Sequence, residues 1–218
     1  MRQLPLSGSE PLLDMDQWAK PRAVRNHNCY AFGMDDYFNS AVPVPKQQPG
    51  DRSGANHTLF DLSTCEIVKR ILADNPGHVY KEAPERPCRQ GFHKVFVFND
   101  PNPKTEDFHF MRQVGDILYT LKPGETERSV ARKFGLPASK VFRLRGGRLL
   151  LSATGLWAHK MGHATGALLE DSCGKVIRDP RTACRTVGER NYTLNCGALC
   201  ARSGRVRTRK DANYVPSR

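Results

Sequence analysis

Hydrophobic positions recur at helical spacing from about Leu62 to Ala73, with Val68 and Leu72 on one face. This spacing predicts a helix. Two short runs of strand-forming residues follow, Lys94 to Asn99 and Phe108 to Val114, and a proline-rich turn separates them. We therefore expect two strands after the helix.

The pattern changes between Ile117 and about Leu151, where it predicts a strand, two helices and a second strand. Thr126 is the expected N-cap of the first helix, which ends at Gly135. The second helix is expected to begin near Pro137 and to end at Gly146 and Gly147. A compact βααβ module of about 35 residues is therefore predicted.

The rest of the chain is less regular. Residues 1–25 contain prolines but little periodicity, and we interpret them as an N-terminal arm. A helix is predicted from Cys29 to Phe38, and the proline- and glycine-rich residues 40–54 form a loop that can lie beside a cleft. Leu156 to Lys160 is predicted to be a strand, and Asp171 to Ile177 a hairpin or turn followed by a strand.

Composition narrows the class of protein. The 218 residues are 39% hydrophobic, which is enough for a core, and the net charge of +12 attracts polyanions. Residues 201–218 form a basic tail with few apolar residues, expected to be solvated and able to contact nucleic acid or other subunits. No apolar run reaches the roughly 20 residues of a membrane span.

The first twenty residues include Glu10, Asp14 and Asp16, where a secretory signal would be apolar. We therefore expect no signal peptide. Delivery by lysis, by specialised secretion or as a virion component fits this expectation, with a cytoplasmic location otherwise.

The seven cysteines are scattered and lack paired Cys-x-x-Cys spacing. Cys196 and Cys200 come nearest to a ligand pair, but we expect reduced, buried thiols rather than a metal site. No Walker loop or zinc-finger spacing is present. The sequence therefore predicts no cofactor and no metal.

The segment from Ile117 to Leu151 resembles a LysM repeat, a small module that binds polymers containing N-acetylglucosamine. The matching residues are Tyr119, Thr120, Leu121, Lys122, Pro123, Gly124, Glu125, Thr126, Val130, Ala131, Phe134, Gly135, Val141 and Leu144. The resemblance implies a peptidoglycan or chitin partner. We expect Tyr119, Gly124, Thr126 and Trp157 to bind substrate.

Cys29 is the candidate nucleophile. It follows Asn28 at the predicted start of a helix, where the positive end of the helix dipole and free backbone N–H groups favour a thiolate. Two histidines follow on strands: His109 begins one, and His159 ends another. They are 50 residues apart, and removing the 35-residue module leaves 15.

This order and spacing resemble the NlpC family of papain-like cysteine peptidases and amidases. The resemblance implies an α+β fold with N-terminal helices and an antiparallel sheet, built from residues 26–116 and 152–200, with 117–151 as an insertion. It also implies that Cys29 attacks a carbonyl, that His109 is the base and that His159 orients His109. Asp107 or Asp179 is the alternative orienting residue.

The sequence thus predicts a cell-wall hydrolase that cleaves an amide bond of peptidoglycan. The alternative is a non-catalytic structural or virion protein that keeps the papain-like fold. A weaker third reading is an acyltransferase with the same triad. The arrangement of Cys29, His109 and His159 in the folded chain separates these interpretations.

Overall fold

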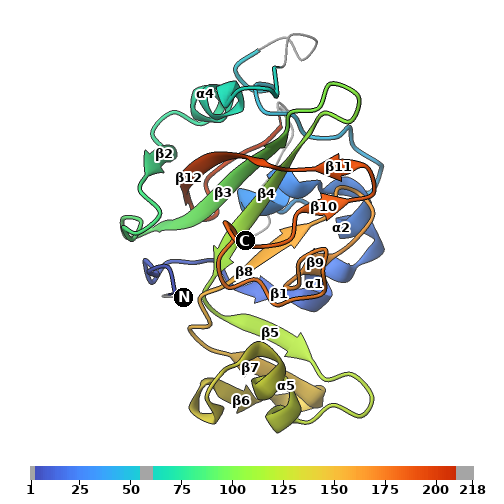
Figure 1. Cartoon of the computed structure of the whole chain (residues 1–218). Helices are drawn as coiled ribbons and strands as arrows, with labels where there is room; N and C mark the ends of the chain where they lie inside the picture. Colours follow the sequence, from blue (N-terminus) through green and yellow to red (C-terminus); the bar gives the residue numbers. More distant parts are fainter. Residues whose placement is uncertain (1–2, 55–60, 210–218) are drawn as a thin grey trace.

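The computed structural model describes residues 3–54 and 61–209 and is a mixed α+β fold made mostly of sheet. An antiparallel six-stranded sheet of order β2-β12-β3-β4-β8-β9 forms its centre (Figure 1). The strands are β2 (Val79–Glu82), β3 (Phe92–Asp100), β4 (Asp107–Val114), β8 (Leu156–Lys160), β9 (Ala167–Leu168) and β12 (Leu194–Arg202). The two strands predicted at Lys94 to Asn99 and Phe108 to Val114, and the strand ending at Lys160, are confirmed.

Five α-helices accompany the sheets in the described residues: α1 (Met15–Ala19), α2 (Pro21–Asn26), α3 (Cys29–Gly33), α4 (Glu66–Asp74) and α5 (Glu127–Phe134). The region predicted to be an arm therefore contains α1 and α2, with Trp18 buried. The longest described helix has nine residues, and none of those in the described ranges combines the length and apolar composition needed to cross a bilayer.

The two faces of the sheet are covered differently because side chains alternate along each strand. On one face, Tyr30 of α3 and Ile71 of α4 pack against Val97, Phe108 and Phe110. The opposite face carries Phe96, Phe98, Met111 and Trp157, which pack against Leu4, Ile177 and Tyr192. Helices thus cover one face, and irregular segments cover the other.

A second sheet has the order β1-β5-β7-β6 and lies at one end of the molecule with α5 (Figure 1). It contains β1 (Leu13–Asp14), β5 (Ile117–Thr120), β6 (Val141–Arg143) and β7 (Arg148–Leu151). The predicted second helix is wrong: residues Ala138–Lys140 and Arg145–Gly147 are single 3-10 turns, η2 and η3, on either side of β6. Val141 and Phe142 are strand formers, and they pair with β7.

The module is also joined to the N-terminal segment. β1 runs parallel to β5, with Leu13 opposite Ile117. One hydrophobic cluster includes Leu13 and Trp18 from the N-terminal region, Phe134 and Leu149 from the module, and Ala158 from the central sheet. The cores of the module and of the remaining fold are therefore continuous.

Three other expectations need correction. The predicted helix from Cys29 to Phe38 ends at Gly33, and Asp35 then adopts a left-handed conformation at φ 56°. The segment after Asp171 is a turn with one bridge, Glu170 to Val176, and not a strand. Val206 and Thr208 of the predicted basic tail are fully buried; residues 210–218 of that tail lie outside the described residues.

The cysteines are mostly paired, which contradicts the expectation of reduced thiols. The disulfides are Cys65–Cys196, Cys88–Cys200 and Cys173–Cys184, and Cys29 alone of the seven is free. Cys196 and Cys200, considered above as metal ligands, both belong to β12. Their bonds tie this strand to the start of α4 and to the segment before β3. A two-stranded antiparallel ribbon precedes β12 in the chain and consists of β10 (Thr186–Val187) and β11 (Arg190–Asn191).

Candidate active site

Cys29 is the first residue of α3, and its backbone position is fixed by Asn28 and Gln47. The side chain of Asn28 accepts a hydrogen bond from the N–H of Ala31 at 3.1 Å, as an N-cap does. The backbone N–H of Asn28 donates to Oε1 of Gln47 at 3.1 Å, and its side-chain amide donates to the Gln47 carbonyl at 2.7 Å. The loop that follows the nucleophile helix therefore holds the start of that helix in place.

The thiol of Cys29 is buried and protonated. Only 3% of the residue is exposed, and Sγ–H donates to the carbonyl of Phe108 at 3.5 Å. Burial, with a smaller effect of Asp107, raises the pKa of Cys29 to about 12. The expected lowering at a helix start is not found, because a dipole contributes about 0.3–1 kcal/mol at a helix end whereas desolvating a charge costs several kcal/mol.

His109 and His159 form a direct hydrogen bond in the interior. Strands β4 and β8 pair with Met111 opposite His159, so the two imidazoles share one face of the sheet. Nε2 of His109 lies 2.8 Å from Nδ1 of His159, and Nε2 of His159 lies 2.8 Å from the carbonyl of Glu170. The two predicted histidines are therefore in contact, and an orienting role of His159 stays a prediction.

This chain of bonds assigns the tautomers. A carbonyl only accepts, so Nε2 of His159 carries a proton and Nδ1 of a neutral His159 accepts. Nε2 of His109 must then be the donor, which leaves the lone pair of His109 on Nδ1. Burial lowers the pKa of both imidazoles, that of His109 strongly, so both are neutral near pH 7. A neutral His109 can therefore accept a proton at Nδ1.

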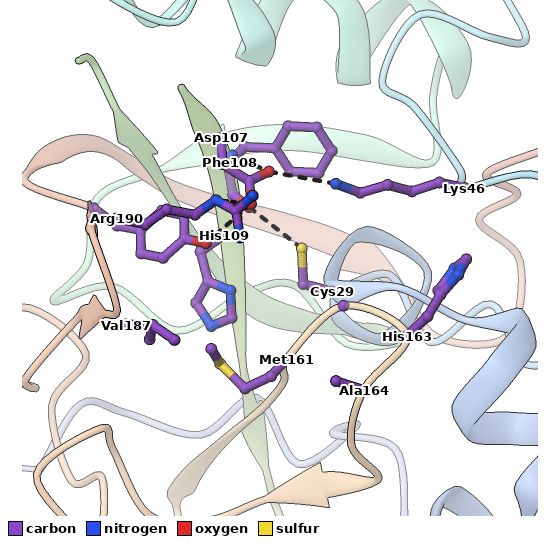
Figure 2. A pocket seen from close by; sticks show the side chains of 12 residues that line it. Cys29, Lys46, Asp107, Phe108, His109, Met161, His163, Ala164, Val187 and Arg190 are labelled. Carbon is purple, nitrogen blue, oxygen red and sulfur yellow. Dashed lines mark hydrogen bonds and ion pairs between the residues drawn. The ribbon is translucent and has the colours of Figure 1, made fainter. Parts of the chain in front are cut away.

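Cys29 and His109 lie on either side of an open stretch of strand edge. In the described residues, β8 pairs with Met111 to Val114 of β4, which leaves the beginning of β4 without a β8 partner. Cys29 approaches this edge from the face covered by α3, where it packs with Phe108. His109 belongs to the opposite alternation, so the two side chains flank β4 (Figure 2).

Both residues line one pocket of about 390 Å³. Its rim is charged: Asp107 accepts from the hydroxyl of Tyr192 at 3.0 Å and forms ion pairs with Lys46 and Arg190, each at 3.4 Å. Figure 2 shows Lys46 and Arg190 reaching Asp107 from opposite sides. Asp107, considered above as an orienting residue, therefore organises the rim, and Asp179 is bound by Arg181 instead.

The other predicted substrate-binding residues have structural contacts. The hydroxyl of Tyr119 donates to the carboxylate of Glu125 at 2.8 Å, and the side chain of Thr126 caps α5. Gly124 occupies the turn between them at φ 80°. Trp157 is fully buried against Phe96 and does not line the pocket. Sugar binding by this set stays a prediction.

Several residues of the site were missed in the sequence. Gln47 and Lys46 lie in the loop that was expected beside the cleft, but no pattern distinguishes them from its other polar residues. Arg190 and Tyr192 come from β11 and the following segment, and only the fold brings them to Asp107. The contact of His159 with the Glu170 carbonyl involves backbone, which a sequence pattern does not reveal.

No group of three or more His, Cys, Asp or Glu side chains in the described residues could hold a metal ion. Comparison with protein-family models, with curated proteins and with solved structures finds no match for this chain.

Proposed function

We propose that this protein is a papain-like cysteine hydrolase of NlpC type that cleaves an amide bond in peptidoglycan. The observation that carries the proposal is the hydrogen-bonded chain from the Glu170 carbonyl through His159 to His109, whose imidazole lines the same pocket as the free thiol of Cys29. A neutral imidazole and a free thiol at one pocket are the two groups that nucleophilic catalysis by a cysteine uses, which supports the proposal.

The chemistry follows from these groups. The thiol turns from the Phe108 carbonyl toward Nδ1 of His109, transfers its proton there and attacks the substrate carbonyl carbon. The tetrahedral intermediate collapses when His109 returns the proton to the leaving amine and the C–N bond breaks. Water then attacks the thioester, loses a proton to His109 and releases the acid, which restores the thiol. His159 keeps His109 in the required tautomer throughout.

The positive charge of the chain and of the pocket rim supports an anionic polymer as substrate. The net charge of +12 attracts polyanions, and Lys46 and Arg190 stand at the rim of the pocket. The LysM-like segment supports an N-acetylglucosamine polymer, although β6 replaces the second helix of the predicted module. We infer peptidoglycan because both resemblances lead to this polymer.

The disulfides bear on where the protein acts. Three of them are typical of proteins that work in oxidising surroundings. This supports delivery out of the reducing cytosol, or a place in a virus particle, over a cytoplasmic location.

A non-catalytic structural role is the second candidate. Cys29 and His109 are each only 3% exposed, and the thiol is bonded to the Phe108 carbonyl rather than to the imidazole. A protein that keeps a hydrolase fold but has lost the activity can keep this arrangement. Turnover therefore has to be measured directly.

The test is mass spectrometry of the soluble fragments released from purified peptidoglycan by the wild-type protein and by Cys29→Ala. Fragments from the wild type alone would support the hydrolase, and their masses would identify the bond. Equal release by both proteins would reject Cys29 as nucleophile. Sedimentation of both proteins with the wall, without fragments from either, would favour the structural role.

A further inference from the structure

Lys160 is a buried cation without a carboxylate partner. The residue has no exposed surface, and Nζ donates to the carbonyl of Val24 at 2.9 Å and to that of Gly162. None of the carboxylates in the described ranges lies within ion-pair distance of it. A buried charge is expensive unless an opposite charge or several dipoles compensate it, so this position calls for an explanation.

The position of Lys160 along β8 places it on the face of the sheet that α3 covers. His159 and Lys160 are consecutive, so their side chains leave opposite faces of the sheet. His159 is on the face of His109. Lys160 is on the face of Ala158, which packs in one cluster with Phe32 of the nucleophile helix. Gly162, whose carbonyl accepts from Lys160, also lines the pocket that contains Cys29.

Three charged groups act on the Cys29 thiol. Asp107 raises its pKa, while Lys46 and, by a smaller amount, Lys160 lower it. The side chain of Lys46 is 45% exposed and already paired with Asp107, so solvent and its partner screen its charge. Of the two lysines, Lys160 is the one without an ion pair in the described residues, and its burial keeps dissolved salt from screening its charge.

The titratable groups around Lys160 do not offset its charge. Cys29 faces it from α3, His27 from the end of α2 and His163 from the turn after β8. Burial lowers the pKa of His27 to about 4, and burial also lowers that of His163, so both are neutral near pH 7. The thiolate of Cys29 is the one anion that this group of residues can generate.

We propose that Lys160 is a positioning residue whose ammonium stabilises the thiolate of Cys29 while the thiol proton is held on Nδ1 of His109. The inference rests on the proposed function, because that proton transfer is its first step. Lys160 keeps its own protons. No bond to Lys160 forms or breaks, and its effect is electrostatic.

The test is the pH dependence of Cys29 alkylation by iodoacetamide, read by intact mass. In this reaction the sulfur forms a bond to the methylene carbon, iodide leaves and the thiol proton is lost. The other six cysteines are in disulfides, so the label reports one site. Turnover is not needed for the readout, so this test and the peptidoglycan assay can fail independently.

Burial lowers the pKa of Lys160 to about 8, which predicts the shape of the profile. Below pH 8 the wild-type rate should rise tenfold per pH unit, because the thiolate fraction does so. Near pH 8 the slope should fall, since loss of the ammonium makes the thiolate harder to form. Lys160→Met should give a profile without this break and about tenfold slower below pH 8, merging with the wild type above it.

Lys94→Met is the matched control. Lys94 is also buried, and its ammonium donates to two carbonyls, those of Pro84 and Arg86, but it is not among the charges that act on Cys29. This variant should lose stability as Lys160→Met does and keep the wild-type profile. Lys46→Met should retain the break near pH 8, because its charge is exposed and paired.

Three results would overturn the inference: a wild-type profile without a break through pH 8, a Lys160→Met profile that overlays the wild type, or an equal change in Lys94→Met. If Lys160→Met does not fold, the alkylation profiles of the wild type and of Lys160→Arg test the inference instead. Arginine stays charged throughout, so its profile should rise without a break while keeping the faster rate.

Discussion

Nε2 of His109 donates a hydrogen bond to Nδ1 of His159 at 2.8 Å, and His159 donates onward to the Glu170 carbonyl. The orienting group of this candidate triad is therefore a neutral imidazole instead of a carboxylate. Such a group fixes the tautomer of His109 but offers no negative charge to stabilise an imidazolium. The resting state is consequently a neutral thiol beside a neutral imidazole, in agreement with the raised pKa of Cys29 and the lowered pKa of His109.

Replacing His159 tests this arrangement. His159→Gln can accept from His109 through Oε1 and donate to the Glu170 carbonyl through Nε2, so kcat should fall only modestly. His159→Leu removes the acceptor and frees His109 to adopt the other tautomer, and kcat should fall about 10²-fold or more. Release of peptidoglycan fragments measures both. Equal activity of the Leu variant and the wild type would contradict an orienting role.

The cysteine pairing predicts the number of free thiols in the native and in the unfolded protein. Reaction with Ellman's reagent should detect almost no thiol in the native protein at neutral pH, because Cys29 is buried and protonated. Unfolding without a reductant should expose one thiol, and unfolding with prior reduction should expose all seven. Three or more thiols in the unfolded, unreduced protein would show that one of the disulfides is not formed.

The candidate site of Cys29, His109 and His159 could be predicted because a local sequence pattern indicates each of the two strands that carry the histidines. The strand patterns place both histidines on paired strands, and subtraction of the module aligns them. The contacts of Lys46 and Arg190 with Asp107 could not be predicted, because they join segments that are far apart in the chain. Lys160 is the last residue of a predicted strand, and only the structure shows that its charge is buried without a carboxylate partner in the described residues.

The least predictable element is β12, the strand between β2 and β3. Its sequence contains Gly197, two alanines and two cysteines, which is not the composition of a typical strand, and it has a register shift between Asn195 and Ala198. The disulfides to Cys65 and Cys88 have sequence separations of 131 and 112 residues. Spacing alone does not reveal such pairings, since six cysteines allow 15 connectivities.

Buried neutral histidines predict loss of stability in acid. Nδ1–H of His27 donates to the Ala23 carbonyl, and Nε2 accepts from the N–H of Phe38, so the folded state binds the neutral ring. Burial lowers its pKa from 6.5 to about 4. Between these values the unfolded chain binds more protons than the folded one, so the free energy of unfolding falls as pH falls.

The loss from His27 alone approaches about 3 kcal/mol at pH 4. Urea unfolding at pH 7, 5.5 and 4.5 measures it. His27→Gln should be less stable at pH 7, because one amide cannot replace both bonds of the ring, but its stability should change less with pH. A slope in the Gln variant equal to that of the wild type would assign the acid sensitivity to other groups.

The last prediction concerns the LysM-like module. Interpreted as an insertion in a hairpin, residues 117–151 should be removable and leave a foldable core. The structure argues for the opposite result, because Leu13 pairs with Ile117 and is fully buried, and because Trp18 shares a hydrophobic cluster with Phe134. Arg178 also donates to the Phe134 carbonyl at 2.8 Å.

Deleting 117–151 and joining the ends with a short Gly-Ser turn would expose Leu13, Val114 and Leu156, which are all buried in that cluster. Each large apolar side chain that becomes exposed costs about 1.5–3 kcal/mol, and the total is a large fraction of a typical free energy of unfolding. The deletion variant should therefore lose its cooperative thermal transition. Phe142→Ser is the control, since this side chain is exposed on β6 and should change the Tm little. A cooperative transition of the deletion variant near the wild-type Tm would show that the module is a separable domain.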